Sequence, residues 1–292
     1  MVFKIRGAVK DYIWGGNRLA EYGYPGDRVA EAWVLSFHRD GMAETGGRPV
    51  NEVIPRSMWG ADCERFGEFP VLIKLIDAKD NLSVQVHPSD EYALAHEGQY
   101  GKTEMWYVVE AGEGAGLYVG FSRKTDKSRL RSLIEENRLL EALNFFPVHS
   151  GDCFFIPSGT VHAIGKGCLI AEVQQNSNLT YRVYDYGRVG ADGKPRQLHI
   201  DKALEVADLS EYRPAQFPDG ILAQCDYFRT WSAEGTVGYD GSFTSVLFLG
   251  NGSVDGMAAA KGDSWFIPAG RRAQVKGKAL LTAVPDARGG LK

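Results

Sequence analysis

The sequence predicts a mainly β protein made of two small barrels, with only a few short helices. Glycine is frequent, at 35 of 292 residues. The runs between the glycines are short and rich in β-branched and aromatic residues, which is typical of strands in sandwiches and barrels. A nine-residue segment also recurs near the end of the chain, which indicates a duplicated unit.

Seven runs have the length and composition of strands. They are residues 71–76, 82–87, 105–109, 153–156, 169–173, 245–249 and 264–267. Helical periodicity is strongest over residues 127–143, where leucines and an isoleucine share one stripe. Two shorter helices are predicted at 89–96, with Ser89 or Asp90 as N-cap, and at 201–207.

The repeat divides the chain. Residues 151–159 read GDCFFIPSG and residues 262–270 read GDSWFIPAG, with six of nine positions identical. Residues 212–220 carry two prolines and a glycine and are suited to a linker. We therefore expect one domain over 1–210, with N-terminal and helical additions, and a second over 211–292.

Charge and cysteine content exclude several classes. The net charge of −4, without a Lys/Arg run, argues against nucleic-acid binding. The first residues lack the apolar core of a signal peptide, and no stretch is long and apolar enough to span a membrane. The four cysteines form no CxxC pair and are expected to be reduced. A cytoplasmic location, with no membrane partner, is the expectation.

Four side chains are candidate metal ligands. Gln85 and His87 lie two apart on a predicted strand, so they share one face. Glu104 begins the next strand, and His162 lies five residues after Pro157 on a third. Two imidazoles, a carboxylate and an amide suit a borderline metal such as zinc. The second copy has Ala273 where the first has His162, so we expect a degenerate domain without a metal site.

Other polar residues are expected to be structural. The remaining histidines carry no ligand spacing, and a role stays open only for His199. Lys74 and Asp77 are expected to pair within an apolar strand. Trp14 and Trp106 are expected to pack rather than to stack on a sugar.

Long motifs around these residues resemble the type I phosphomannose isomerases, in particular their short bacterial branch. The resemblance extends from Phe69 to about Ala203. It rests on FPVLIKLIDAK (69–79), LSVQVHP (82–88), GKTEMWY (101–107), residues 151–163 and TYRVYDYGR (180–188), with Trp14-Gly-Gly16 and Ala32-Trp33 also matching. It implies two cupin (jelly-roll β-barrel) domains, of which the second matches only in degenerate form.

The resemblance also implies a site and a reaction. It places one zinc ion per chain on Gln85, His87, Glu104 and His162, and a catalytic arginine at Arg182. Lys102 would line the substrate pocket, and Arg188 would help to bind the phosphate, unless it simply pairs with Asp185 or Asp192. Many relatives have an aspartate where this chain has Asn178, so any role of that carboxylate must be met otherwise.

The implied reaction interconverts mannose 6-phosphate and fructose 6-phosphate through an enediolate, which needs charge stabilisation and a general base. Lys102 is the first candidate base, because nearby positive charges would favour its neutral form, and substrate binding is its alternative role. A metal-bound water and Glu172 are further candidates. The competing functions are a cupin isomerase or oxygenase with another substrate and a non-catalytic sugar-phosphate-binding cupin. The partner is a small sugar phosphate, and the protein is expected to be a monomer or homodimer.

Overall fold

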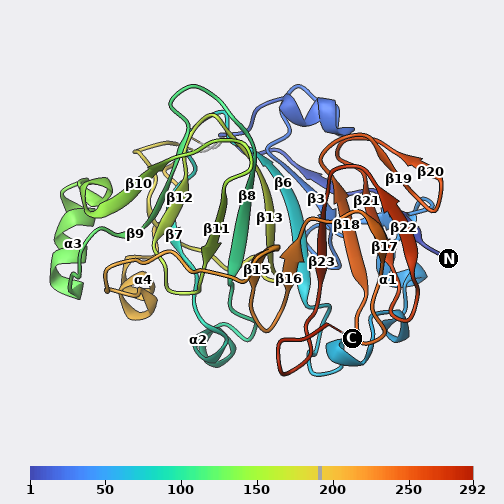
Figure 1. Ribbon diagram of the computed structural model, residues 1–292. Helices are drawn as coiled ribbons and strands as arrows, with labels where there is room; N and C mark the ends of the chain where they lie inside the picture. Colours follow the sequence, from blue (N-terminus) through green and yellow to red (C-terminus); the bar gives the residue numbers. More distant parts are fainter. Residues whose placement is uncertain (190–192, 292) are drawn as a thin grey trace.

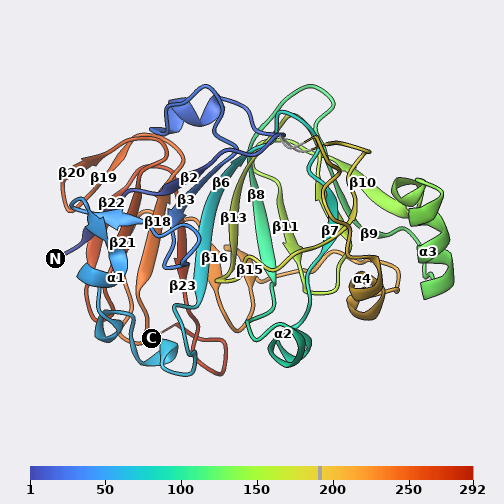
Figure 2. The same ribbon diagram turned by 180° about the vertical axis from the view of Figure 1, so that it is seen from behind.

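Two β-barrels lie side by side in the computed structural model, which describes residues 1–189 and 193–291 (Figure 1). Each barrel is made of two facing antiparallel sheets, so the predicted mainly β, duplicated fold is confirmed. Figure 2 shows from behind how the strands near the N-terminus cover the boundary between the barrels.

The first barrel contains a five-stranded and a six-stranded sheet. The five-stranded sheet has the order β10 (Leu143–Pro147), β9 (Gly116–Phe121), β12 (His162–Ile164), β7 (Val84–Val86) and β14 (Tyr181–Tyr184). The six-stranded sheet has the order β11 (Cys153–Ile156), β8 (Glu104–Ala111), β13 (Cys168–Gln175), β6 (Val71–Asp77), β3 (Glu31–Leu35) and β2 (Ala8–Lys10). All five strands predicted for this half are therefore present.

The second barrel contains a six-stranded and a four-stranded sheet. The larger has the order β1 (Phe3–Ile5), β21 (Ser264–Ile267), β18 (Thr244–Phe248), β23 (Ala279–Ala283), β16 (Arg229–Trp231) and β15 (Ile221–Gln224). The smaller has the order β17 (Gly235–Val237), β22 (Ala273–Lys276), β19 (Gly252–Val254) and β20 (Met257–Ala259). A separate ribbon pairs β4 (Glu44–Thr45) with β5 (Arg48–Pro49).

The two barrels repeat one strand order. β11-β8-β13-β6 in the first corresponds to β21-β18-β23-β16 in the second, and β9-β12-β7 corresponds to β19-β22-β17. The repeated segment forms β11 and β21. Its flanking glycines all have left-handed φ angles, at 103° and 87° in the first copy and 88° and 75° in the second. Because L residues avoid this conformation, the repeated glycines are explained by the turns on either side of the strand.

The helices are short and lie outside the barrels. They are α1 (Val50–Val53), α2 (Asp90–His96), α3 (Lys127–Glu135) and α4 (Ile200–Val206). Short 3-10 helices are η1 (Arg18–Tyr22), η2 (Arg56–Met58), η3 (Ala61–Cys63) and η4 (Leu139–Ala142). The Ser89 side chain accepts a hydrogen bond from the Tyr92 N–H and caps α2.

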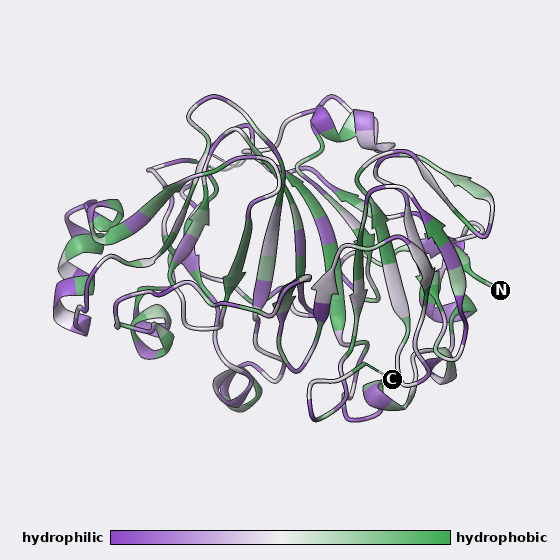
Figure 3. Cartoon of the chain, viewed as in Figure 1, coloured by the Kyte–Doolittle hydropathy of each residue, from purple (hydrophilic) through white to green (hydrophobic). Residues whose placement is uncertain are grey.

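The single helix predicted over 127–143 is wrong in its second half. The chain forms α3 and then η4, with Asn137 between them at a φ of 56°. An asparagine tolerates this left-handed conformation, which ends the helix although the leucine stripe continues into η4. Figure 3 shows the mixed hydropathy of α3, whose Leu130, Leu133 and Ile134 are buried.

Four apolar clusters hold the described part of the fold together. One fills the first barrel around Trp106, another fills the second around Trp265, and a third packs α3 and α4 against the five-stranded sheet. The largest joins the facing six-stranded sheets of the two barrels, where Phe69, Phe243 and Phe266 meet. β1 pairs with β21, so the first strand of the chain belongs to the sheet of the C-terminal strands, and the predicted boundary near residue 210 stays a prediction.

Candidate metal centre

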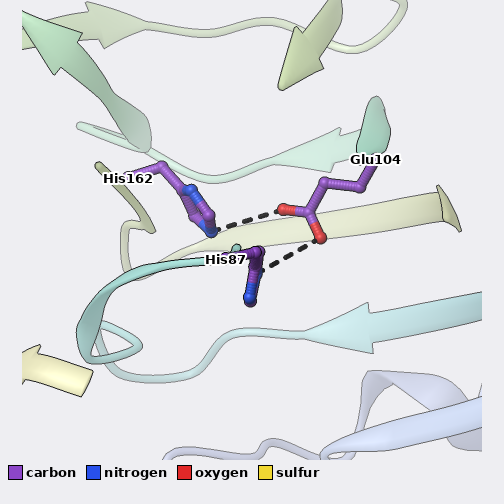
Figure 4. A group of neighbouring side chains, drawn as sticks. All are labelled: His87, Glu104 and His162. Carbon is purple, nitrogen blue, oxygen red and sulfur yellow. Dashed lines mark ion pairs between the residues drawn. The ribbon is translucent and has the colours of Figure 1, made fainter. Parts of the chain in front are cut away.

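Three predicted ligands meet inside the first barrel. His87 follows β7, Glu104 begins β8 and His162 begins β12, and each is at most 1% exposed. His87 Nε2 is 3.7 Å from one Glu104 oxygen, and His162 Nε2 is 3.4 Å from the other. Figure 4 shows both rings facing this one carboxylate. Within residues 1–189 and 193–291, these three residues form the one group of three or more His, Cys, Asp or Glu side chains that lie close enough together to hold a metal ion.

Backbone carbonyls orient both imidazole rings. His87 Nδ1 is 2.8 Å from the Leu179 carbonyl, and His162 Nδ1 is 2.8 Å from the Thr160 carbonyl. Each ring therefore donates its Nδ1–H and directs the Nε2 lone pair toward Glu104, which is how metal-binding histidines are commonly held. Burial and the Lys102 charge lower the pKa of His162 to about 4 and that of His87 well below its usual value. Both rings are neutral, as metal ligands must be.

Glu104 has the features expected of a metal ligand. It is fully buried, and neither of its oxygens accepts a hydrogen bond of good geometry from the described residues. Burial and the charge of Glu172 raise its pKa. The Lys102 ammonium lies 2.5 Å from Glu104 Oε2 and 3.3 Å from His87 Nε2. A buried, incompletely satisfied carboxylate beside two lone pairs fits a divalent cation.

Gln85 completes the predicted set. It lies on β7 directly opposite His162, and its amide nitrogen is 3.4 Å from His162 Nε2. A half-turn of the amide exchanges its nitrogen for its oxygen, the atom that can bind a metal. The structure thus brings Gln85, His87, Glu104 and His162 together, while their role as ligands stays a prediction.

A chain of buried charges leads away from this cluster. Glu172 Oε1 is 3.7 Å from Lys102 Nζ and 3.4 Å from Lys74 Nζ, and Lys74 Nζ is 3.6 Å from Glu31 Oε2. Burial raises the pKa of Glu172, but the charges of Lys102 and Lys74 together lower it by more, so the net shift of the pKa is downward. Glu172 is therefore an ionised carboxylate between two ammonium groups.

The expected pairing of Lys74 with Asp77 is wrong. Lys74 lies in this charge chain, whereas Asp77 binds Arg18, with 2.7 Å between carboxylate and guanidinium. The two residues are three apart on β6, so their side chains leave opposite faces of the strand. Trp14 and Trp106 are both buried in the apolar cluster of the first barrel, and Trp106 also donates a hydrogen bond to Glu172. Trp14 lines the cavity described next, so the expectation that it does not stack on a sugar stays a prediction.

A cavity of about 300 Å³ opens beside the cluster. Gln85, Lys102 and Glu172 line one end, and Arg182, Arg196 and His199 also line it. Arg182 lies on β14 opposite Gln85; its Nε donates to Ser83 Oγ and its Nη1 to the Gln197 carbonyl. No carboxylate within the described residues forms an ion pair with Arg182, so its charge is available to an anionic ligand.

Arg188 and Arg196 share one carboxylate. Asp185 Oδ1 is 2.5 Å from a guanidinium nitrogen of each, and Arg188 also donates to the Asn81 carbonyl. Asp192, the other suggested partner of Arg188, lies outside the described residues. Arg196 lines the cavity, and Arg188 is not among its lining residues. Sequence reasoning missed Arg196, because it lies in an irregular segment after Pro195 that has no strand periodicity.

The second barrel has other residues at the equivalent positions. Across β12 and β7 His162 faces Gln85, and across β22 and β17 Ala273 faces Val237. Glu104 pairs with Ile156, whereas Thr244 pairs with Ile267. The substitution pattern explains why the described metal-ligand group lies in the first barrel alone.

Fold and site together define a two-barrel protein of the cupin type with a candidate metal centre in one barrel. Residues 2–108 match the family model described as "Phosphomannose isomerase type I, catalytic domain". The mannose-6-phosphate isomerase ManA of Bacillus subtilis is 40% identical over an alignment of 246 residues that covers 78% of this chain and 78% of the relative. A mannose-6-phosphate isomerase of Streptococcus mutans is 44% identical over 207 residues, covering 68% of this chain and 65% of the relative.

A solved structure of a Bacillus subtilis mannose 6-phosphate isomerase superimposes with a TM-score of 0.84 at 30% identity, covering 97% of this chain and 98% of that one. The chain belongs to the type I phosphomannose isomerases. Among the described residues, no helix is long and apolar enough to cross a membrane.

Proposed function

We propose that the protein interconverts mannose 6-phosphate and fructose 6-phosphate with the help of one bound zinc ion. The single observation that carries the proposal is that one cavity joins the metal-ligand cluster to two arginines. Gln85 and Lys102 line it beside the cluster, and Arg182 and Arg196 supply positive charge. A volume of about 300 Å³ is at the lower end of the range for small-molecule sites, which suits a sugar phosphate.

Gln85, His87, Glu104 and His162 would hold the ion. Nitrogen and oxygen ligands in a four-residue set favour zinc among the biological divalent metals. When bound, the ion supplies a Lewis acid that polarises the oxygen atoms at the first two carbons of the open-chain sugar. Lys102 contacts both Glu104 and Glu172 and lines the cavity, so its ammonium would lie beside the bound ion and the substrate.

Arg182 and Arg196 would hold the phosphate and the sugar. A guanidinium offers a planar pair of donors that matches phosphate oxygens. Arg182 lies on β14 beside Gln85 of β7 and lines the same cavity, so it can also reach developing negative charge on the sugar oxygens. Arg188 was predicted to bind the phosphate directly. It would instead act through Asp185, because the Asp185 carboxylate pairs with both Arg188 and Arg196.

Glu172 and Lys102 would move the protons. The reaction takes a proton from one carbon and returns it to its neighbour, while an oxygen gains or loses another. Glu172 is ionised and lines the cavity, so its carboxylate can accept a proton from carbon. Lys102 can donate to the adjacent oxygen. A sugar-phosphate-binding protein without activity would not need this pair, so the isomerase is favoured over that alternative.

A coupled assay tests the proposal by measuring fructose 6-phosphate formed from mannose 6-phosphate. The zinc-loaded protein should be active, the chelator-treated protein inactive, and zinc should restore the rate. Glu172→Gln should lower kcat by about 10²–10⁴-fold, the usual contribution of a general base. The exposed Glu91→Gln is a matched control. Full activity after complete metal removal, or in Glu172→Gln, would refute the mechanism.

A further inference from the structure

His199 occupies a defined position beside Arg182. It directly precedes α4, and its ring lines the cavity. The His199 backbone N–H donates to the Arg182 carbonyl at 2.7 Å, and His199 Nδ1 accepts the Arg182 backbone N–H at 3.2 Å. The ring makes no capping bond to α4. Strand β14, not the helix, therefore fixes the ring in the cavity.

These contacts also fix where the ring carries its proton. Because Nδ1 accepts a hydrogen bond, the neutral ring has its proton on Nε2. Burial and the Arg182 charge lower the pKa of His199, so the neutral form prevails at neutral pH. Nε2 makes no hydrogen bond to any residue that the structure describes. The cavity is thus lined by an uncharged ring with an unused N–H donor.

The surrounding charges indicate the ligand of this donor. Arg182 and Arg196 both line the cavity, and among the described residues the Asp185 carboxylate pairs with Arg196 and Arg188 but not with Arg182. A phosphate dianion balances these charges, and a neutral donor adds a hydrogen bond without excess charge. We propose that His199 Nε2–H donates a hydrogen bond to the phosphoryl group of the bound sugar phosphate and makes His199 a specificity-determining residue. The inference rests on the proposed function.

Two isosteric substitutions separate this contact from a structural role. The amide oxygen in His199→Asn can replace Nδ1 and keep the bond to Arg182, but the donor at the Nε2 position is lost. The amide nitrogen in His199→Gln can replace Nε2, but the Nδ1 acceptor is lost. His199→Asn should raise KM for mannose 6-phosphate and Ki for inorganic phosphate about tenfold, equivalent to about 1.4 kcal/mol, with kcat little changed. His199→Gln should stay within about threefold of wild type.

The control is His149→Asn, a histidine whose side chain is 89% exposed and which should change neither constant. A larger loss of phosphate affinity in His199→Gln than in His199→Asn would overturn the proposal, because the bond to Arg182 would then be what matters. Wild-type protein that binds phosphate but does not isomerise the sugar would refute the proposed function, while the phosphate constants would still test His199.

A measurement on unsubstituted protein covers the case in which the variants fail to fold. The imidazole N–H resonance of His199, assigned as the signal absent from a His199→Gln sample or by its contacts to Arg182, should shift on titration with inorganic phosphate. A resonance that does not move at saturating phosphate would overturn the proposal.

Discussion

Replacing Lys74 by Met tests whether the buried charge chain holds the first barrel together. Lys74 is 4% exposed, and its ammonium lies 3.6 Å from Glu31 and 3.4 Å from Glu172. At an effective dielectric constant of about 20, each contact is worth about 5 kcal/mol before the cost of burial. Burial lowers the pKa of Lys74, but Glu31 and Glu172 outweigh it and the net shift is upward, so the attraction exceeds that cost.

Lys74→Met would leave Glu31 without its cation and would leave Glu172 with Lys102 as its remaining ammonium partner among the described residues. Removing one partner from a buried ion pair typically costs about 3–5 kcal/mol, and we expect a loss of this size in the free energy of unfolding. Urea unfolding of the metal-free protein, followed by circular dichroism, measures it. Adding Glu31→Gln should recover part of the loss, and the exposed Lys79→Met should stay within about 0.5 kcal/mol of wild type. A loss below about 1 kcal/mol in Lys74→Met would refute the reasoning.

Three further predictions concern the metal, the arginine and pH. Saturating zinc should raise the melting temperature of the chelator-treated protein, since ligand at about a thousand times its Kd stabilises by about 4 kcal/mol; an unchanged melting temperature in calorimetry would argue against a resident ion. Arg182→Ala should lower kcat about a hundredfold while bound zinc, measured by elemental analysis, is unchanged; wild-type kcat would remove Arg182 from the reaction. Burial lowers the folded-state pKa of His38, so the unfolded chain binds more protons, and wild type should lose unfolding free energy as pH falls below about 6.5. His38→Gln should show a smaller loss than wild type, because the lowered pKa values of His87, His162 and His199 still contribute. Equal pH slopes for the two proteins in urea unfolding would contradict the assignment.

Local pattern was enough to predict seven of the longer strands and the convergence of the candidate ligands. Strands β11 and β21 have the predicted bounds, because a glycine that needs a left-handed φ stands on each side of them. Gln85, His87, Glu104 and His162 could be expected to converge, because strand alternation sets which face a side chain occupies. Family resemblance supplied the rest of that prediction, including Arg182.

Contacts between distant segments could not be read from local pattern. Arg196 enters the cavity because Asp185 orients its guanidinium, and nothing in its neighbours along the chain indicates this pairing. Lys74 turns to Glu31 and Glu172 because β3 and β13 flank β6, an order that only the folded sheet defines. The leucine stripe after residue 135 does not reveal that Asn137 adopts a left-handed conformation.

The pairing of β1 with β21 has a consequence for synthesis on the ribosome. Phe3 leaves the exit tunnel long before its neighbour Phe266. Strand β1 therefore has no partner strand until β21 has been translated, and contacts this far apart in sequence form slowly. Deleting β1 should impair maturation of the C-terminal barrel more than that of the first barrel, which follows β1 directly in the sequence.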